Sequence, residues 1–360
     1  IALKAFLQHP RVLYAVELGV GVGLMAATRE TFVFSLFAWG VASIIWLLQA
    51  HPSDSPLELL RRSWRAYSRL LLLSFVIVAG IIVASYSSFG KNPAGVSDFF
   101  RAYLVYDTVP GHEKPALYYL ELLLWPKHRA GLWWTEIGVL LLALYGYFLC
   151  PRGETRSAVC RFLMHSGAIH LAIYSLLAYK TPWLASLAWV HFCLAAGIGA
   201  VQLIRTARGW WRIPAAAIIA AILIWQGMQS DHATGRLASD ARNPYAYVPT
   251  SRDVERMGTW LEALRQQHPP LDQQAVAVVG SFYWPLPWYL RGFSKVSYWE
   301  TLPEDAAHRP LLLVLSTAKE ADLACLKETH ECFPRGLRHE VLVTVAIRKD
   351  IWGHPGGNSR

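Results

Sequence analysis

Seven apolar stretches, each close to the length of a membrane-crossing helix, occupy most of the first 229 residues. A helix needs about 20 residues to cross the hydrocarbon core of a bilayer, where every backbone polar group must be bonded internally. Charged residues make up 16% of the chain, whereas soluble globular proteins carry about a quarter. The sequence therefore predicts a polytopic α-helical membrane protein. The expected spans are residues 12–28, 31–48, 70–87, 131–149, 162–178, 183–203 and 213–229.

Basic residues indicate how these spans are oriented. Residues 1–229 hold 19 Lys and Arg against 10 Asp and Glu, whereas residues 230–360 hold 15 of each. If the seven spans alternate in direction, 12 of the 19 basic residues fall on one side. Basic residues concentrate on the cytoplasmic side of membrane proteins, so this side is expected to face the cytoplasm. Its segments are 1–11, 49–69, 150–161 and 204–212.

The remaining connections are therefore expected outside the cytoplasm. They are the turn 28–30, the loop 88–130, the turn 179–182 and everything after residue 229. The sequence thus predicts an integral protein of the cytoplasmic (inner) membrane, in contact with membrane lipids. The basic excess belongs to membrane loops and gives no reason to expect nucleic acid as a partner.

The chain changes character after its membrane domain, residues 1–229. Residues 251–267 have a helical period, with Ser251 placed to cap the helix, and the short runs AVAVVG, LLLVLS and EVLVTVAI have β character. Residues 230–360 are therefore expected to form a small extracytoplasmic α/β domain. The chain has no glycine-rich phosphate-binding motif, so we expect no nucleotide cofactor.

Cys325 and Cys332 lie in this expected outer domain, in the segment CLKETHEC. An oxidising exterior would permit a disulfide between them, but spacing alone leaves a bridge and two free thiols equally open. With His330 they supply three ligands and no fourth, so no metal site is predicted.

The loop 88–130 contains GHEKPALYYLELLLWP, residues 111–126. A helix here would place Tyr118, Leu122 and Trp125 on one face, which is typical of an amphipathic helix in the membrane interface. His112, Glu113 and Lys114 would precede it at the membrane surface.

Three cations fall on the expected outer face: Arg29, Lys114 and Lys180. Lys180 lies alone between two apolar runs in AYKTPWL, where Pro182 suits a first helical turn and Thr181 can cap it. The three cations could clamp a phosphate or diphosphate whose lipid tail occupies the bilayer. Alternatively, each could extend separately to lipid headgroups.

Several motifs resemble the GT-C membrane glycosyltransferases, which include protein O-mannosyltransferases and lipid A aminoarabinose transferases. TRE at 28–30 is similar to their first turn, HEKPALYYL to their outer-loop pattern and YKTPWL to their later basic turn. The flippase-activity-associated proteins of that superfamily are more similar still. That resemblance rests on ATRET, KTPWL, NPYAYVPTSRDV and WPLPWYLRGF, and it extends from Gly19 to Trp299.

The resemblance implies transfer of a sugar from a polyprenyl-phosphate carrier to an acceptor outside the cytoplasm. The residues themselves predict no metal or cofactor. Cations near the lipid phosphate would stabilise the charge that grows on this leaving group. By this resemblance, Arg29 and Lys180 would bind the phosphate, and Glu30 would orient Arg29. The donor pocket would be lined by His112, Lys114, Tyr118 and Tyr119.

The segment WPLPWYLR, residues 284–291, is expected to form a stiff, extended aromatic platform. Exposed aromatic faces are typical of carbohydrate contact, and packing onto the membrane surface would explain them equally well. Arg291 could bind a headgroup, a sugar phosphate or a carboxylate.

One departure from the family concerns the catalytic carboxylates, which the family carries in its first outer loop. Here that connection is only TRE, so we expect an N-terminally truncated sequence whose base lies upstream of Ile1. Asp98, Asp107 and Glu113 are outer-loop acids that could replace it. A noncatalytic membrane subunit, which binds lipid and holds a protein partner through residues 230–360, is the alternative.

Glu17, His170 and His191 fall inside expected spans. Polar residues there could form an ion path, as in a transporter, or be neutral or paired packing residues. Because they are isolated and no span shows transporter-like Gly/Pro breaks, the sequence favours packing.

Overall fold

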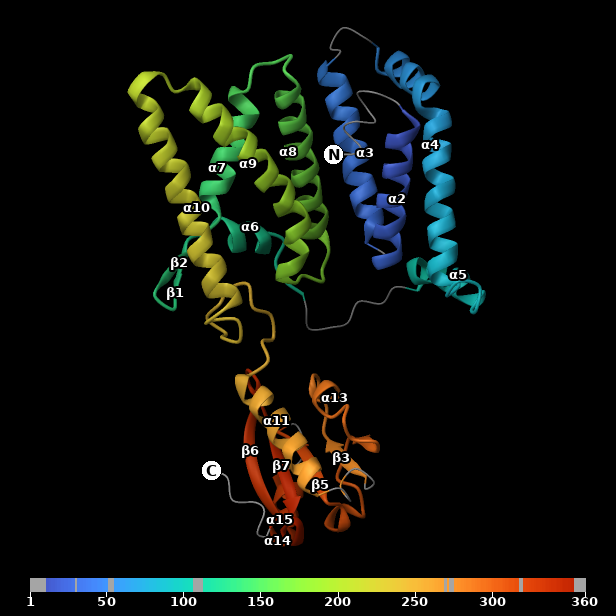
Figure 1. Cartoon of the computed structure of the whole chain (residues 1–360), viewed down its shortest axis with the longest axis vertical. Helices are drawn as coiled ribbons and strands as arrows, with labels where there is room; N and C mark the ends of the chain where they lie inside the picture. Colours follow the sequence, from blue (N-terminus) through green and yellow to red (C-terminus); the bar gives the residue numbers. More distant parts are fainter. Residues whose placement is uncertain are drawn as a thin grey trace. The chain divides into compact units, whose positions relative to one another are not determined.

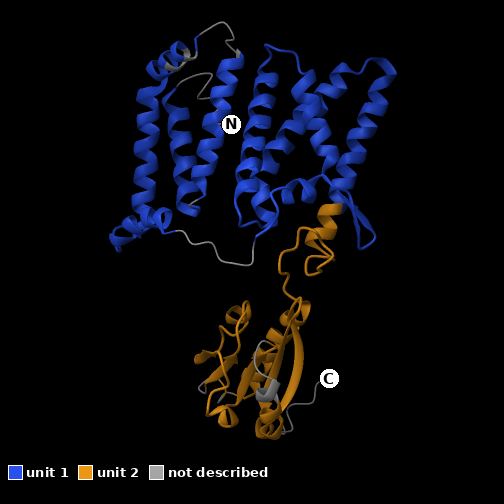
Figure 2. Cartoon of the chain, turned by 180° about the vertical axis from the view of Figure 1, so that it is seen from behind, with its two compact units in different colours: residues 1–228 blue, residues 229–360 orange. Residues whose placement is uncertain are grey.

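The structure, a computed structural model, describes residues 11–29, 31–50, 55–105, 113–268, 271, 275–316 and 320–352. It consists of two compact units, residues 1–228 and residues 229–360 (Figure 2). The boundary lies one residue before the predicted one.

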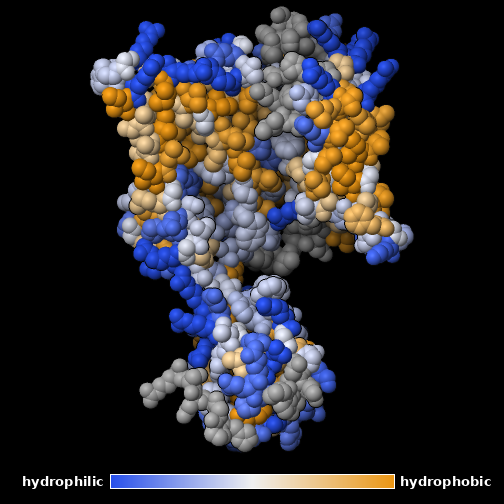
Figure 3. All heavy atoms as spheres, viewed as in Figure 1, coloured by the Kyte–Doolittle hydropathy of each residue, from blue (hydrophilic) through white to orange (hydrophobic). Residues whose placement is uncertain are grey.

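Helices occupy all seven ranges expected to cross the membrane (Figure 1). They are α2 (Val12–Thr28), α3 (Phe32–Ala50), α4 (Pro56–Tyr86), α7 (Ile137–Leu149), α8 (Thr155–Leu176), α9 (Ala185–Thr206) and α10 (Arg212–Thr234). Within the described ranges, four segments are long and apolar enough to cross a membrane: Phe32–Gln49, Arg61–Tyr86, Pro182–Thr206 and Gly209–Thr234. The helices α2 and α7 are apolar but shorter. The described residues thus contain four candidate membrane-spanning helices, which is part of the predicted set. Figure 3 shows an apolar belt around the helices of the first unit on the face in view.

Glycines allow the closest helix contacts. In α2, a Cβ on Gly19 would lie 2.9 Å from the Ser74 carbonyl oxygen of α4, and Ser74 Oγ donates to the Ala15 carbonyl at 2.7 Å. In α9, a Cβ on Gly199 would lie 1.8 Å from the Leu142 carbonyl oxygen of α7. Close backbone approach through small residues is how membrane helices gain van der Waals contact without a hydrophobic driving force.

Short elements gather at one end of these helices (Figures 1 and 2). They are α5 (Ala94–Leu104), α6 (Tyr118–Leu123), the hairpin β1 (Lys127–Arg129) and β2 (Leu132–Trp134), and the 3-10 turn η1 (Pro182–Leu184). Another 3-10 turn, η2 (Gly209–Trp211), precedes α10.

The amphipathic helix predicted over 111–126 is wrong in length and in face. Within its described part only Tyr118–Leu123 is helical, and Tyr119, Leu122 and Leu123 are buried, whereas Trp125 is 71% exposed. The following span starts at Ile137 rather than at residue 131 because the hairpin comes first. Ala130 and Gly131 have φ of 52° and 80°, as a two-residue hairpin turn requires.

The second unit is built on a five-stranded sheet in the order β4-β3-β5-β7-β6. Strand β3 (Val276–Val279) is parallel to β4 (Val296–Trp299) and β5 (Leu311–Leu315), while β7 (Val341–Arg348) is antiparallel to β5 and β6 (His330–Arg338). The core on one sheet face includes residues of α11 (Arg252–Gln267) and α13 (Leu286–Tyr289). The other face packs residues of η3 (Ala306–His308) and α14 (Glu320–Thr329), and α15 (Lys349–Trp352) follows β7.

Three β runs and the capped helix were predicted correctly, and Ser251 Oγ accepts the Asp253 N–H at 3.2 Å. One expectation for this unit fails. The WPLPWYLR segment is not extended, because Leu286–Tyr289 forms one helical turn that tolerates Pro287 in its first positions. Of the two alternatives left open for CLKETHEC, the structure has the free thiols: Cys325 lies on α14 and Cys332 lies on β6.

Candidate functional site

Lys180 is almost fully buried, with 2% of its surface exposed. It follows the end of α8, and its Nζ donates to the Leu177 carbonyl. It forms no ion pair with any carboxylate in the described part of the chain. Removing an ammonium group from water without a paired carboxylate is costly, so the burial of Lys180 among the described residues suggests a site for an anion.

The turn after Lys180 is only partly as predicted. Pro182 begins the turn η1, as expected, and Thr181 has the extended backbone of a capping residue, with φ −129° and ψ 150°. The Thr181 side chain, however, makes no capping bond. Its Oγ1 is buried and has no hydrogen-bond partner among the described residues.

The outer-loop motif packs against this turn. Glu113 and Tyr179 form an antiparallel backbone bridge, and Tyr119 Oη donates to the Thr181 carbonyl at 3.1 Å. Tyr119 is fully buried, and this burial raises the pKa of its hydroxyl, which therefore stays protonated. The motifs HEKPALYYL and YKTPWL, far apart in sequence, thus meet in one place.

Two other predicted residues lie at the edge of this contact. Tyr118 is half-buried, with its ring centroid 5.1 Å from that of Tyr119. Lys114 follows the bridge residue Glu113 and is exposed. The fold therefore places Lys114 beside the turn of Lys180 without burying it.

Arg29 is linked to the same region by its proximity to Tyr174, which lies near Tyr119. Arg29 caps the end of α2 and is exposed, and its charge lies within electrostatic reach of the Tyr174 hydroxyl. Tyr174 is 1% exposed, lies near Tyr119, and has its hydroxyl beside the side chain of Thr31. Sequence reasoning missed Tyr174. Its only signal was a tyrosine six residues before Lys180 in an apolar run.

Three predicted residues lie outside the part of the chain that the structure describes: Glu30, His112 and Asp107. Of the other outer-loop acids considered as bases, Asp98 is on an exposed face of α5. Glu113 has its backbone paired with Tyr179, next to Lys180. Of the candidate bases in the described residues, Glu113 is the one whose backbone pairs with the lysine turn.

The intramembrane histidines are hydrogen-bonded. His170 contacts the Ser166 carbonyl through Nδ1 at 2.8 Å and Ser35 Oγ through Nε2 at 3.1 Å. His191 contacts the Leu187 carbonyl at 2.6 Å and accepts the Trp39 indole N–H at 3.1 Å. A carbonyl only accepts, so each Nδ1 carries the proton and each Nε2 is free to accept. This arrangement satisfies two neutral rings, which agrees with packing rather than an ion path.

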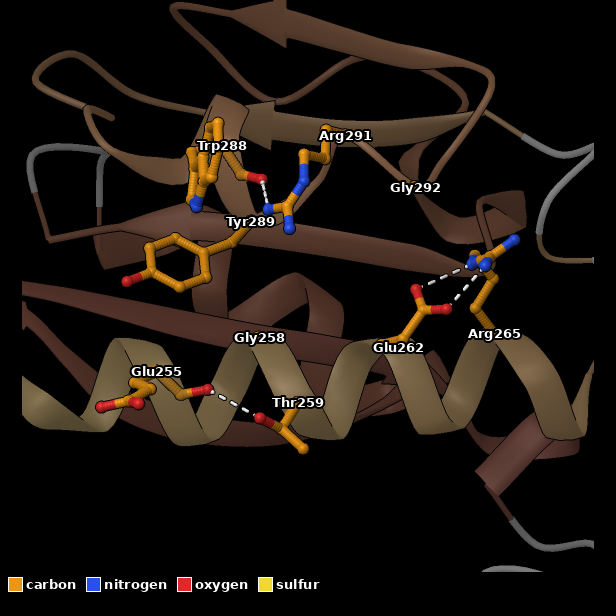
Figure 4. Close-up of a pocket in the computed structure, with 9 residues that line it drawn as sticks. All are labelled: Glu255, Gly258, Thr259, Glu262, Arg265, Trp288, Tyr289, Arg291 and Gly292. Atoms are coloured by element: carbon orange, nitrogen blue, oxygen red, sulfur yellow. Dashed lines mark hydrogen bonds and ion pairs between the residues drawn. The ribbon is translucent and has the colours of Figure 1, made fainter.

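Arg291 belongs to a separate pocket in the second unit, of about 590 Å³ (Figure 4). Its guanidinium lies 4.2 Å from the ring centre of Trp288, and Nη1 donates to the Trp288 carbonyl at 2.5 Å. Across the pocket, Glu262 of α11 binds Arg265 at 2.6 Å. Trp288 is 61% exposed, so its indole remains available for a contact.

Within the described ranges, no three His, Cys, Asp or Glu side chains are gathered as a metal site. Comparison with known proteins finds no matching family model, no similar curated protein and no similar solved structure. Arguments about function therefore rest on the chemistry of the residues around Lys180.

Proposed function

We propose that this chain is a membrane glycosyltransferase that takes a sugar from a polyprenyl-phosphate carrier and attaches it to an acceptor outside the cytoplasm. The observation that carries the proposal is the buried Lys180, which has no acidic partner in the described residues. One buried hydroxyl without a partner among the described residues, that of Thr181, belongs to the same turn. Buried polar groups are almost always bonded, so this hydroxyl is consistent with a missing polar ligand.

A lipid phosphate has the chemistry that this cluster lacks. Phosphate oxygens accept charge-assisted hydrogen bonds from an ammonium, and hydroxyls can donate to the same group. During transfer, an acceptor oxygen attacks the anomeric carbon, and the bond from that carbon to the phosphate oxygen breaks. The electron pair stays on the phosphate, while the acceptor proton passes to a general base.

Lys180 and Arg29 would have different roles in that step. Lys180 would lie beside the phosphate and stabilise its growing charge, and the exposed Arg29 would approach from the end of α2. Tyr119 would act as a positioning residue, because it holds the turn of Lys180 through the Thr181 carbonyl. Glu113 is the described acid that we would test first as the base.

The proposed setting is the cytoplasmic membrane, crossed seven times, with residues 230–360 outside the cytoplasm. Two features support it: helices occupy all seven apolar ranges, and 12 of the 19 basic residues of 1–229 fall on one side. The polyprenyl chain and the membrane lipids would then be hydrophobic partners of the first unit.

The test uses the full chain in native membranes with a labelled polyprenyl-phosphate sugar, and it follows release of polyprenyl phosphate. Lys180→Gln should lower the rate about 100-fold or more, as for loss of a charge-stabilising donor elsewhere. Lys180→Arg should retain part of it. The matched control is Lys91→Gln, an exposed lysine after α4. Normal release by Lys180→Gln and by Arg29→Ala would rule out the phosphate clamp.

A noncatalytic subunit is the second candidate, because the first outer connection, residues 28–30, is too short to hold the family's catalytic carboxylates. This candidate predicts that the chain binds the polyprenyl-phosphate lipid through Lys180 but releases no polyprenyl phosphate. The same membranes distinguish the two, since lipid binding and turnover are measured separately. A protein partner held by residues 230–360 would co-purify with the full chain.

A further inference from the structure

A second cluster of cations lies in the second unit, directly after the apolar helix α10. It lines a pocket of about 430 Å³ that includes Arg236, Arg252, Arg338 and the hydroxyls of Ser239 and Ser251. We name it the arginine pocket. It is separate from the pocket of Arg291 and from the cluster around Lys180.

None of the three guanidinium groups forms an ion pair with a carboxylate in the described part of the chain. Arg252 donates to the carbonyls of Gly235 and Arg236, at 3.4 and 3.3 Å. Arg338 donates to the Phe282 carbonyl at 2.7 Å, and Arg236 contacts His232 Nε2 at 2.9 Å. Each guanidinium has five N–H donors, so most of these donors remain available.

The nearby carboxylates are engaged with other groups. Asp240 lines the pocket but binds Arg242 at 2.7 Å, and this pairing lowers its pKa to about 2. Asp253 accepts the Gly336 N–H at 3.3 Å, and Glu340 lies 3.7 Å from His339. Among the described residues, none of these carboxylates forms an ion pair with the three arginines, so an anion in the pocket would offset their charge.

The arginines are held in place. The hydrogen bonds to the Gly235 and Arg236 carbonyls hold the Arg252 guanidinium against the chain that follows α10. The ring of Phe282 lies 5.8 Å from the Arg338 guanidinium. Burial lowers the pKa of Arg338, so a neighbouring anion would favour its charged form. Planar guanidinium groups already in position suit the oxygens of a phosphate.

The pocket is also tied to the end of α10. Asn243 is 4% exposed, and its Nδ2 donates to the carbonyls of Ala233 and Leu237 at 3.1 and 3.3 Å. Residues 209–234 are apolar enough to cross a membrane, and Arg236 follows two residues later. Arginines at the end of a membrane helix lie at the depth of lipid headgroups.

We propose that the arginine pocket binds the phosphate group of an anionic membrane lipid. The lipid chains would lie in the bilayer, and the headgroup phosphate would accept hydrogen bonds from Arg236, Arg252 and Arg338. This site does not depend on the proposed glycosyl transfer. Hydrogen bonds between these arginines and the headgroup phosphate would hold the second unit at the membrane surface.

The test is a calorimetric titration of the full chain, in neutral detergent, with short-chain phosphatidylglycerol, phosphatidylcholine of the same chain length, and inorganic phosphate. Phosphatidylglycerol should bind at least about tenfold more tightly than the other two. Arg236→Gln should weaken it about tenfold, the loss typical of a charge-assisted hydrogen bond. The double variant Arg252→Gln/Arg338→Gln should weaken it further, with the fold checked by thermal unfolding.

Arg256→Gln is the matched control, since Arg256 is exposed one helical turn beyond Arg252 and does not line the pocket. It should leave the affinity for phosphatidylglycerol unchanged. Equal binding of phosphatidylcholine would overturn the proposal, as would equal weakening by Arg256→Gln. Inorganic phosphate binding as tightly as phosphatidylglycerol would also overturn it, because the pocket would then take free phosphate.

Discussion

The Tyr119 hydroxyl connects the two motifs of the candidate site, because it donates to the Thr181 carbonyl from a fully buried position. That carbonyl also accepts the Leu184 N–H at 3.1 Å. Tyr119→Phe therefore removes one of two bonds and should lower the free energy of unfolding by about 1 kcal/mol. Thermal unfolding in detergent, followed by thiol-dye labelling of the buried Cys160, measures the change.

Tyr14→Phe is the control for that substitution. Tyr14 is half-buried in α2, and its hydroxyl makes no hydrogen bond among the described residues. Its removal should leave unfolding unchanged. If Tyr119→Phe unfolds at the wild-type temperature, the bond to Thr181 does not stabilise the turn.

At the scale of single residues, the sequence identified candidate residues but did not predict their burial or their contacts. A lone Lys180 between apolar runs indicated a turn at the membrane surface, yet its burial depends on packing of the outer-loop segment, which has no local signal. Tyr174 was missed for the same reason, since a tyrosine within an apolar span is compatible with lipid, core or a site. The Thr181 capping bond was wrong because backbone position does not determine where a side chain points.

Helix packing tests the role of glycine at the scale of elements. A Cβ on Gly199 of α9 would lie 1.8 Å from the Leu142 carbonyl of α7, whereas Gly197 has nothing within 4 Å. Gly199→Ala should force the helices apart and lower the free energy of unfolding by about 1–3 kcal/mol. The readout is the labelling rate of Cys160, which packs between these helices. Gly197→Ala should leave this rate unchanged or slow it, and equal rates for both variants would contradict the close contact.

Helices and strands could be predicted from the sequence where a single physical constraint determined them. Crossing a bilayer requires long apolar helices, so their ranges could be read from hydropathy. The hairpin β1–β2 was missed because its turn, Ala130 and Gly131, lies beside apolar residues that resemble a span. Strands β4 and β6 were missed because both are sheet edges with exposed residues, and β6 contains Pro334, which normally argues against a strand.

At the scale of the molecule, the number of crossings is the central question. The helix α7 has 13 residues, which at about 1.5 Å per residue is shorter than the hydrocarbon core of about 30 Å. If the membrane is crossed seven times, the residues that flank α7, such as those of the preceding hairpin, must therefore lie at the membrane interface. Four crossings, by α3, α4, α9 and α10 alone, would leave α7 and α8 on one side.

Three cysteines distinguish these arrangements. Ser88, Pro151 and Cys325 are exposed and lie after α4, after α7 and on α14. With the other native cysteines replaced, a membrane-impermeant maleimide should label Ser88→Cys and native Cys325 in intact cells. It should label Pro151→Cys only after permeabilisation, because one crossing separates it from residue 88 and three separate it from residue 325.

Other patterns of labelling would contradict this topology. With four crossings, no crossing lies between residues 88 and 151 and two lie between residues 151 and 325, so all three cysteines would react alike. Labelling of Pro151→Cys alone in intact cells would preserve seven crossings but reverse the orientation inferred from the basic residues.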